Sequence, residues 1–228
     1  MYRIMVEGID ASAATGTFAL AASDFQMELP GNGSSFTAPS ALVLRARRVG
    51  MTRNVAFVEF LMDGTVLGQV DAAAPEMPLM LDAPGYHSIE VRATDTRGLV
   101  VTPDPIGIVV RPAHDAFNNA QEVSGYAFEV ETSNRGATQD GDPVYFSNVG
   151  GHSLWYRWTA PHDGLYLLRG QAVGFHPVMN VFVQSQALGL SPVILGVFGI
   201  PGAPIGFQGV AGTTYFICVD SFWGEKGS

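Results

Sequence analysis

The sequence predicts an all-β protein, and three observations carry that prediction. Apolar and polar residues alternate wherever a period can be read, which is the pattern of strands with one face in water. No window of a dozen residues holds an apolar stripe of helical spacing without an interrupting Gly or Pro. The 228 residues include 27 Gly and 14 Pro, more turn-forming residues than helical proteins carry. This length corresponds to one large domain or two medium ones.

The first group of predicted strands lies in residues 24–111. Residues 41–47 and 55–62 are apolar runs of strand length, and Asp63-Gly64 after the second run is a two-residue hairpin signal. Residues 87–93 alternate strictly between apolar and polar side chains. Strands spaced by about 8–12 residues are typical of a seven-strand sandwich of immunoglobulin type.

A second β-sandwich is predicted for residues 112–228, because the chain changes character around Pro112 and we place a boundary there. Only residues 115–122 could form a short helix, and Gly, Pro and Asn turns separate the other elements. The predicted strands are residues 126–132, 153–159, 164–171, 178–184, 193–198 and 214–220.

An internal repeat relates the two ends of the chain. Residues 2–8 match residues 215–221 in order: an aromatic residue, a variable one, Ile, a sulfur-containing residue, Val, an acid and a small residue. The chain is therefore expected to be one period of a tandem array. Residues 1–22 would be the closing hairpin of a preceding copy, and residues 112–228 would lack their last strand. A chance match between short strands is the alternative.

If residues 112–228 lack their last strand and residues 1–22 carry its equivalent, an exchange of strands is expected, because open strand edges recruit other strands. The residues of the donor strand would be Gly16, Thr17, Phe18, Ala19 and Leu20. The residues of the acceptor edge would be Tyr215, Ile217 and Val219. A donor in the same chain would have to pass a sandwich about 40 Å long on a linker that spans about 3.4 Å per residue. A head-to-tail contact between identical copies is therefore favoured over closure within one chain.

Composition excludes several classes of partner and site. The chain has 12 Lys and Arg against 21 Asp and Glu, a net charge of −9, and its only lysine is Lys226, so no nucleic-acid surface is expected. No apolar run approaches the roughly 18 residues that span a bilayer. Cys218 is the only cysteine, which excludes an intrachain disulfide and a cysteine-based zinc site.

The sequence offers no catalytic constellation, and we predict a chain that is not an enzyme and holds no metal. None of the histidines occurs in a zinc-binding spacing. His152-Ser153 begins like a nucleophile elbow but lacks its closing Gly. Asp140-Gly141-Asp142 has ordinary turn composition, without the rest of a calcium-binding loop.

Three segments in the first half form a family pattern: residues 30–36, Val58-Glu59-Phe60 with its Asp63-Gly64 turn, and residues 84–95. They resemble the bacterial immunoglobulin-like modules of cell-surface proteins and secreted glycosidases. His87 stands where those modules usually carry an inward Tyr, which implies packing and one hydrogen bond rather than chemistry.

Three segments in the second half, residues 115–120, 153–161 and 210–220, form another pattern. They resemble the pre-peptidase C-terminal domain, a jelly-roll-like β-sandwich of secreted bacterial proteases and surface proteins. The resemblance implies a non-catalytic accessory module of exported proteins, some of which bind calcium or a polymeric substrate. Calcium is thus the only cofactor that it allows, and residues 175–177 and 199–204 replace two acidic segments of the family, which puts calcium binding there in doubt.

The expected function is that of an extracellular or cell-surface structural repeat, which forms a fibre or stalk with identical copies. The alternative is an accessory module of a secreted hydrolase that binds polysaccharide or an extracellular-matrix protein. Trp155 and Trp158 are three residues apart on one predicted strand, so their side chains point to opposite faces and at most one is expected in the core. Trp155 could form a platform for a sugar ring. Trp223 lies in a polar loop and is a better candidate for exposure.

Overall fold

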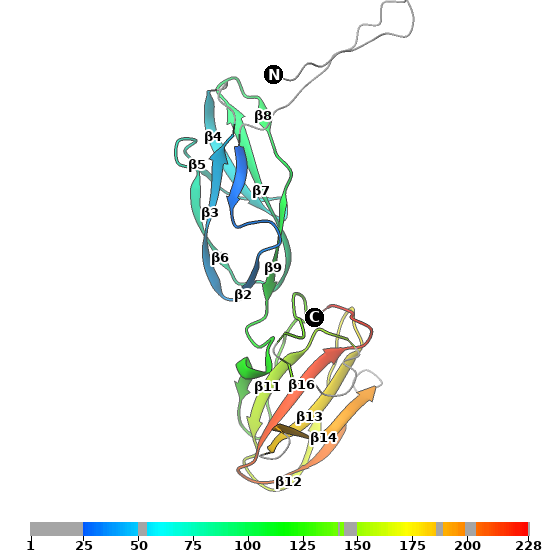
Figure 1. The fold of residues 1–228 in the computed structure, drawn as a ribbon. Coiled ribbons are helices and arrows are strands. Elements are labelled where there is room, and N and C mark those ends of the chain that lie inside the picture. The colour runs from blue at the N-terminus through cyan, green and yellow to red at the C-terminus, as the bar shows by residue number, and fades with distance from the viewer. Residues whose placement is uncertain are drawn as a thin grey trace, which may run out of the picture.

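The protein is described by a computed structural model that covers residues 25–49, 54–140, 142–143, 150–185, 189–198 and 204–227. These residues form strands and one short 3-10 helix, which confirms the all-β prediction. The strands build two sandwiches that lie end to end (Figure 1). No helix among the described residues is long and apolar enough to cross a membrane.

The first sandwich is formed by the strands between residues 25 and 111. They are β1 (Phe25–Leu29), β2 (Ser35–Thr37), β3 (Ser40–Arg48), β4 (Val55–Met62), β5 (Thr65–Val70), β6 (Glu76–Leu81), β7 (Gly85–Asp95), β8 (Val100–Val101) and β9 (Ile106–Arg111). One sheet has the order β1-β3-β6 and the other the order β2-β9-β7-β4-β5, with β8 paired to β7. The three runs predicted at 41–47, 55–62 and 87–93 all lie within these strands.

Alternation along β7 explains how the first sandwich forms its core. Ile89 and Val91 are fully buried and pack with Phe25 and Phe60. Replacing a buried phenylalanine such as Phe60 with alanine typically costs about 3–5 kcal/mol. His87 makes two hydrogen bonds rather than the one expected, because its ring nitrogens contact Asp63 and the carbonyl oxygen of Ala83.

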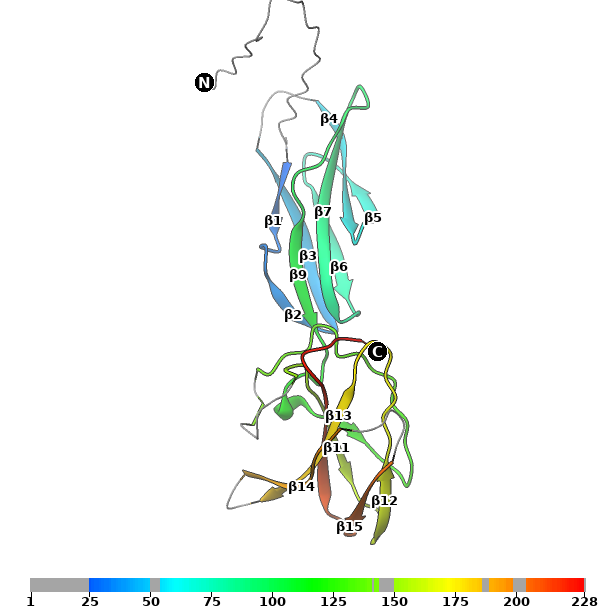
Figure 2. The ribbon, with the colours of Figure 1, turned by 90° about the vertical axis from the view of Figure 1, so that its right-hand side faces the viewer.

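The second sandwich follows a short 3-10 helix, η1 (Phe117–Asn119). Its strands are β10 (Gln121–Val123), β11 (Leu154–Thr159), β12 (Gly164–Leu168), β13 (Pro177–Ser185), β14 (Gly189–Phe198), β15 (Ile205–Gly209) and β16 (Thr214–Ser221). The larger sheet has the order β10-β11-β16-β13-β14, and β12 and β15 form a two-stranded sheet (Figure 2). The 3-10 helix lies inside the 115–122 segment where a short helix was expected.

The strand predicted at residues 126–132 is absent. Residues 124–132 carry no strand assignment, and the backbone of residues 126–131 makes no hydrogen bond to any other described residue. Alternating composition is sufficient to predict a strand, but a strand also needs a partner for its backbone groups, and the described part of the chain supplies none here.

Candidate functional site at the junction of the sandwiches

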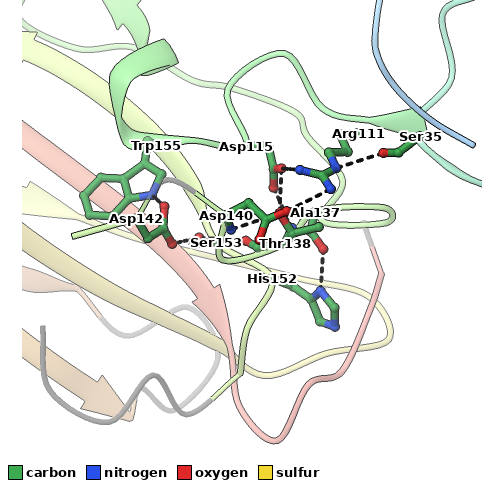
Figure 3. Close-up of polar contacts among 10 residues, drawn as sticks. All are labelled: Ser35, Arg111, Asp115, Ala137, Thr138, Asp140, Asp142, His152, Ser153 and Trp155. Atoms are coloured by element: carbon green, nitrogen blue, oxygen red, sulfur yellow. Dashed lines mark hydrogen bonds and ion pairs between the residues drawn. The ribbon is translucent and has the colours of Figure 1, made fainter. Parts of the chain in front are cut away.

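A single arginine at the end of β9 connects the two sandwiches. The Arg111 Nε donates a hydrogen bond of 3.0 Å to the Ser35 hydroxyl on β2. The same guanidinium lies 2.9 Å from an Asp140 carboxylate oxygen and 3.9 Å from one of Asp115 (Figure 3). The planar, multidentate guanidinium can hold several acceptors in fixed directions. Arg111 therefore joins a strand of the first sandwich to two loops of the second.

Two further contacts cross the junction at other points. Gly136 has a φ of +76° and packs so closely on β9 that an added Cβ would overlap the carbonyl oxygen of Val110. On the C-terminal loop, the Lys226 ammonium lies 4.5 Å from the centre of the Tyr86 ring and 3.2 Å from its hydroxyl. Gly136 and Asp140 belong to the same segment between β10 and β11, whereas Lys226 comes from the C-terminal loop, so two separate segments contact the first sandwich besides the chain that links the two sandwiches.

The loop that carries Asp140 is held by a buried carboxylate. Asp115 is 4% exposed and accepts hydrogen bonds from the Thr138 backbone N–H at 2.5 Å and from its hydroxyl at 2.9 Å. The Thr138 hydroxyl oxygen in turn accepts a hydrogen bond from the Asp140 N–H. These bonds fix the loop and direct Asp140 toward Arg111.

A second carboxylate, that of the half-buried Asp142, lies two residues after Asp140. It accepts a hydrogen bond of 2.6 Å from the Trp155 indole N–H and a short one from the Ser153 hydroxyl (Figure 3). Burial raises the pKa of Asp142 above its ordinary value, and the carboxylates of Asp115 and Asp220 act in the same direction. These two hydrogen bonds tie Asp142 to the start of β11.

Ser153 and His152 do not form a nucleophile with its base. The Ser153 side chain is buried, and its hydroxyl contacts Asp142 and the carbonyl oxygen of Thr138. The His152 Nδ1 contacts the carbonyl oxygen of Ala137 at 2.6 Å. Among the described residues, no three His, Cys, Asp or Glu side chains converge as metal ligands would.

The expectation for Trp155 is wrong, because Trp155 and Trp158 are both buried, each 3% exposed. Trp158 faces the space between the two sheets, whereas Trp155 lies on the other face of β11 and packs against Phe182 and Cys218. Phe117 of η1 covers this outer face, with its ring edge-on to Trp155 at 5.2 Å. Trp155 therefore offers no platform to a sugar ring.

Trp223 is displayed at the surface. Its side chain is 76% exposed, and its backbone has a φ of +56°, which is uncommon for a bulky residue. The ring lies 4.1 Å from that of Phe222. Nearby, Glu225 accepts hydrogen bonds from the His176 backbone N–H and contacts its ring Nδ1, and the His176 ring contact helps hold the pKa of Glu225 below its ordinary range.

The predicted acceptor edge on β16 is also wrong. β16, which carries Tyr215, Ile217 and Val219, pairs with β11 on one side and with β13 on the other. It is the central strand of the five-stranded sheet and has no free edge for a donor. The predicted donor strand, residues 16–20, lies outside the described residues.

No protein-family model and no curated protein sequence matches the chain. Among solved structures, the fibronectin(III)-like modules of CbhA from Clostridium thermocellum are 26% identical, with a TM-score of 0.36 over 39% of this chain and 97% of that chain. A study of carbohydrate-binding modules of the β-sandwich superfamily contains a chain that is 9% identical, with a TM-score of 0.31 over 88% of this chain and 92% of that one. A β-glucuronidase from Bacteroides uniformis is 13% identical, with a TM-score of 0.31 over 88% of this chain and 29% of its own.

Sequence reasoning missed the residues of the junction. Ser35, Arg111 and Asp140 are far apart along the chain, and no spacing relates them. The only available signal was an arginine placed immediately before the proline at the expected boundary. Gly136 gave no signal of its own, because a glycine in a polar loop has many ordinary explanations.

Proposed function

We propose that the chain is a non-catalytic structural module of an extracellular or cell-surface protein. Its two sandwiches form one stiff spacer, and identical copies follow one another end to end as a stalk or fibre. The observation that carries the proposal is the Arg111 contact set, which ties β2 to Asp115 and Asp140 across the junction.

The polypeptide that joins the sandwiches supports the same interpretation. Pro112 follows β9 directly and is buried, and Asp115 after it is already fixed by the Thr138 hydrogen bonds. Domains that move freely are usually joined by exposed, flexible, polar linkers. A buried proline and a fixed loop leave little freedom at this point.

A distance measurement between the sandwiches tests this proposal. Spin labels are placed at exposed positions by Gln69→Cys and Gln208→Cys in a Cys218→Ala background, and the distribution of label distances is measured by pulsed electron resonance. A stiff spacer gives one narrow distribution, which Arg111→Gln broadens. A broad distribution in the unmodified junction would contradict the proposal.

A second candidate function, polysaccharide binding, is favoured by Trp223. An exposed indole held in a left-handed backbone conformation is a costly arrangement that is often retained for contact with a ligand. Glu225 and His176 add polar groups beside it. Electrophoresis in gels that contain soluble polysaccharides tests this function: Trp223→Ala should abolish retardation, whereas Tyr126→Ala, which removes an equally exposed aromatic ring elsewhere, should not.

A further inference from the structure

The two-stranded sheet of the second sandwich has a free edge. β12 pairs antiparallel with β15 from Gly164↔Gly209 to Leu168↔Ile205, and it pairs with no other strand of the described chain. The opposite sheet has five strands. The backbone groups on the outer edge of β12 are therefore a template for another strand.

The outer face of this sheet is apolar where a solvated sheet would be polar. Leu165 and Leu167 are 64% and 56% exposed, and their side chains lie over Gly206 of β15. Tyr166 and Leu168, which alternate with them, pack toward the core. Exposed leucines are unusual on the solvated face of a sheet, and they mark this side of the second sandwich as a contact surface.

Residues 126–131 lie on the same side of the second sandwich, and their backbone has no hydrogen-bond partner among the described residues. The Tyr126 ring is 5.0 Å from His162, whose ring stacks at 5.5 Å on Tyr166 of β12. The segment is exposed throughout, with Tyr126, Phe128 and Val130 alternating with small or acidic residues. It has the composition of a strand and makes no backbone hydrogen bond to the described chain over residues 126–131.

We infer that the free edge of β12 accepts a strand formed by residues 16–20 of a neighbouring copy. This inference rests on the end-to-end arrangement of the proposed function and names its contact. Residues 16–20 contain no charge, and Phe18 and Leu20 share one face of an extended strand. Paired with β12, those two side chains would face the same way as Tyr166, and Thr17 and Ala19 would lie on the face of Leu165 and Leu167.

The donor belongs to another copy because of where β1 begins. Phe25 pairs with Arg48, whereas Ser35–Thr37 pair with the residues of β9 that end at the junction. The start of β1 thus lies at the end of the first sandwich that faces away from the second (Figure 2). The 11 residues of β7 span about 36 Å, and residues 21–24 reach about 14 Å at most, too little to bring residues 16–20 of the same chain back to β12.

The test uses the full chain and a peptide of residues 14–24. In the double variant Phe18→Asp/Leu20→Asp, the donor strand carries charges that cannot enter the core. The control variant Ala13→Asp/Ala14→Asp adds the same charge outside the donor strand. Sedimentation should show assembly of the parent chain and of the Ala13/Ala14 variant, with association at least tenfold weaker in the Phe18/Leu20 variant. The peptide should bind the Phe18/Leu20 variant and slow amide hydrogen exchange in residues 164–168 of β12.

The outcomes separate this inference from the proposed function. If the Phe18/Leu20 variant assembles as the parent does, or if the peptide protects β10 or β14 instead of β12, the inference is overturned while the stiff spacer and its end-to-end order stand. If the peptide protects β12 but the parent chain stays monomeric at high concentration, the acceptor is confirmed and the end-to-end proposal fails.

Discussion

His114 is a half-buried imidazole whose protonation opposes folding. Its Nε2 lies 3.0 Å from the Tyr156 hydroxyl and 3.2 Å from that of Thr132, and burial lowers its pKa. Between the lowered pKa and about 6.5, the unfolded chain binds more protons than the folded one, so the free energy of unfolding falls as the pH falls through that range.

Replacing this side chain should remove that dependence. We expect the parent chain to lose more of its unfolding free energy than His114→Gln between pH 7.5 and pH 5, because only the parent carries a group that the unfolded chain protonates more readily. Urea denaturation at several pH values measures both proteins. Equal losses in the two would show that His114 is not protonated preferentially in the unfolded chain.

Asp142 acts in the opposite direction. Burial raises the pKa of Asp142. At pH values above the ordinary pKa of an aspartate, the folded chain therefore binds more protons than the unfolded chain. The contribution of Asp142 to stability thus grows as the pH falls from 7. Asp142→Asn keeps an acceptor for the Trp155 N–H and carries no charge. The difference in unfolding free energy between parent and variant should shift in favour of the parent on acidification. Urea denaturation at pH 7 and at pH 5 measures this difference. The same difference at both pH values would contradict the prediction.

At the scale of elements, the loop that contains Gly136 is fitted to the end of β9. Gly136→Ala adds a Cβ that meets the Val110 carbonyl oxygen at a positive φ, whereas Gly33→Ala adds one at a φ of +82° with nothing nearby. Both changes incur the conformational cost of about 1 kcal/mol, and only the first forces the loop off β9. We expect Gly136→Ala to lower the unfolding free energy by about 1–3 kcal/mol more than Gly33→Ala. Thermal denaturation of both variants measures this difference. Equal effects would mean that the contact between Gly136 and β9 is dispensable.

Elements that depend on local alternation could be predicted from the sequence, and those that depend on a distant partner could not. Residues 55–62 form β4 because an apolar run of strand length and the Asp63-Gly64 turn act locally. Residues 126–132 alternate between apolar and small or polar residues but form no strand, because no described strand pairs with them. Trp155 was misplaced for a similar reason, because only the folded chain brings Phe117 over the outer face of β11.

The candidate site was less predictable than the fold. Arg111 and its partners come from separate segments, so their meeting depends on how the two sandwiches stack. The acceptor edge was assigned to β16 because its sequence repeats near the start of the chain. The register of β16 between β11 and β13 follows from pairings that no short motif encodes.

At the scale of the whole molecule, the net charge of −9 makes identical copies repel one another. The proposed donor strand is uncharged, so its docking does not depend on ion pairs. Raising the salt concentration from 20 to 300 mM shortens the screening length from about 20 Å to about 6 Å, and the average mass in sedimentation should increase. Dissociation on adding salt would show that ion pairs rather than a strand hold the copies together.

The pairing of β2 with β9 has a mechanical consequence. The two strands run parallel, with Ser35↔Val109, Phe36↔Val110 and Thr37↔Arg111 opposite one another, and the chain enters the first sandwich at one end and leaves it at the other. Tension along the proposed stalk would pull these two strands in opposite directions along their length. Their hydrogen bonds would then be loaded together in shear instead of opening one at a time. Arg111, bonded to Ser35 and to the next sandwich, stands where that load is transmitted.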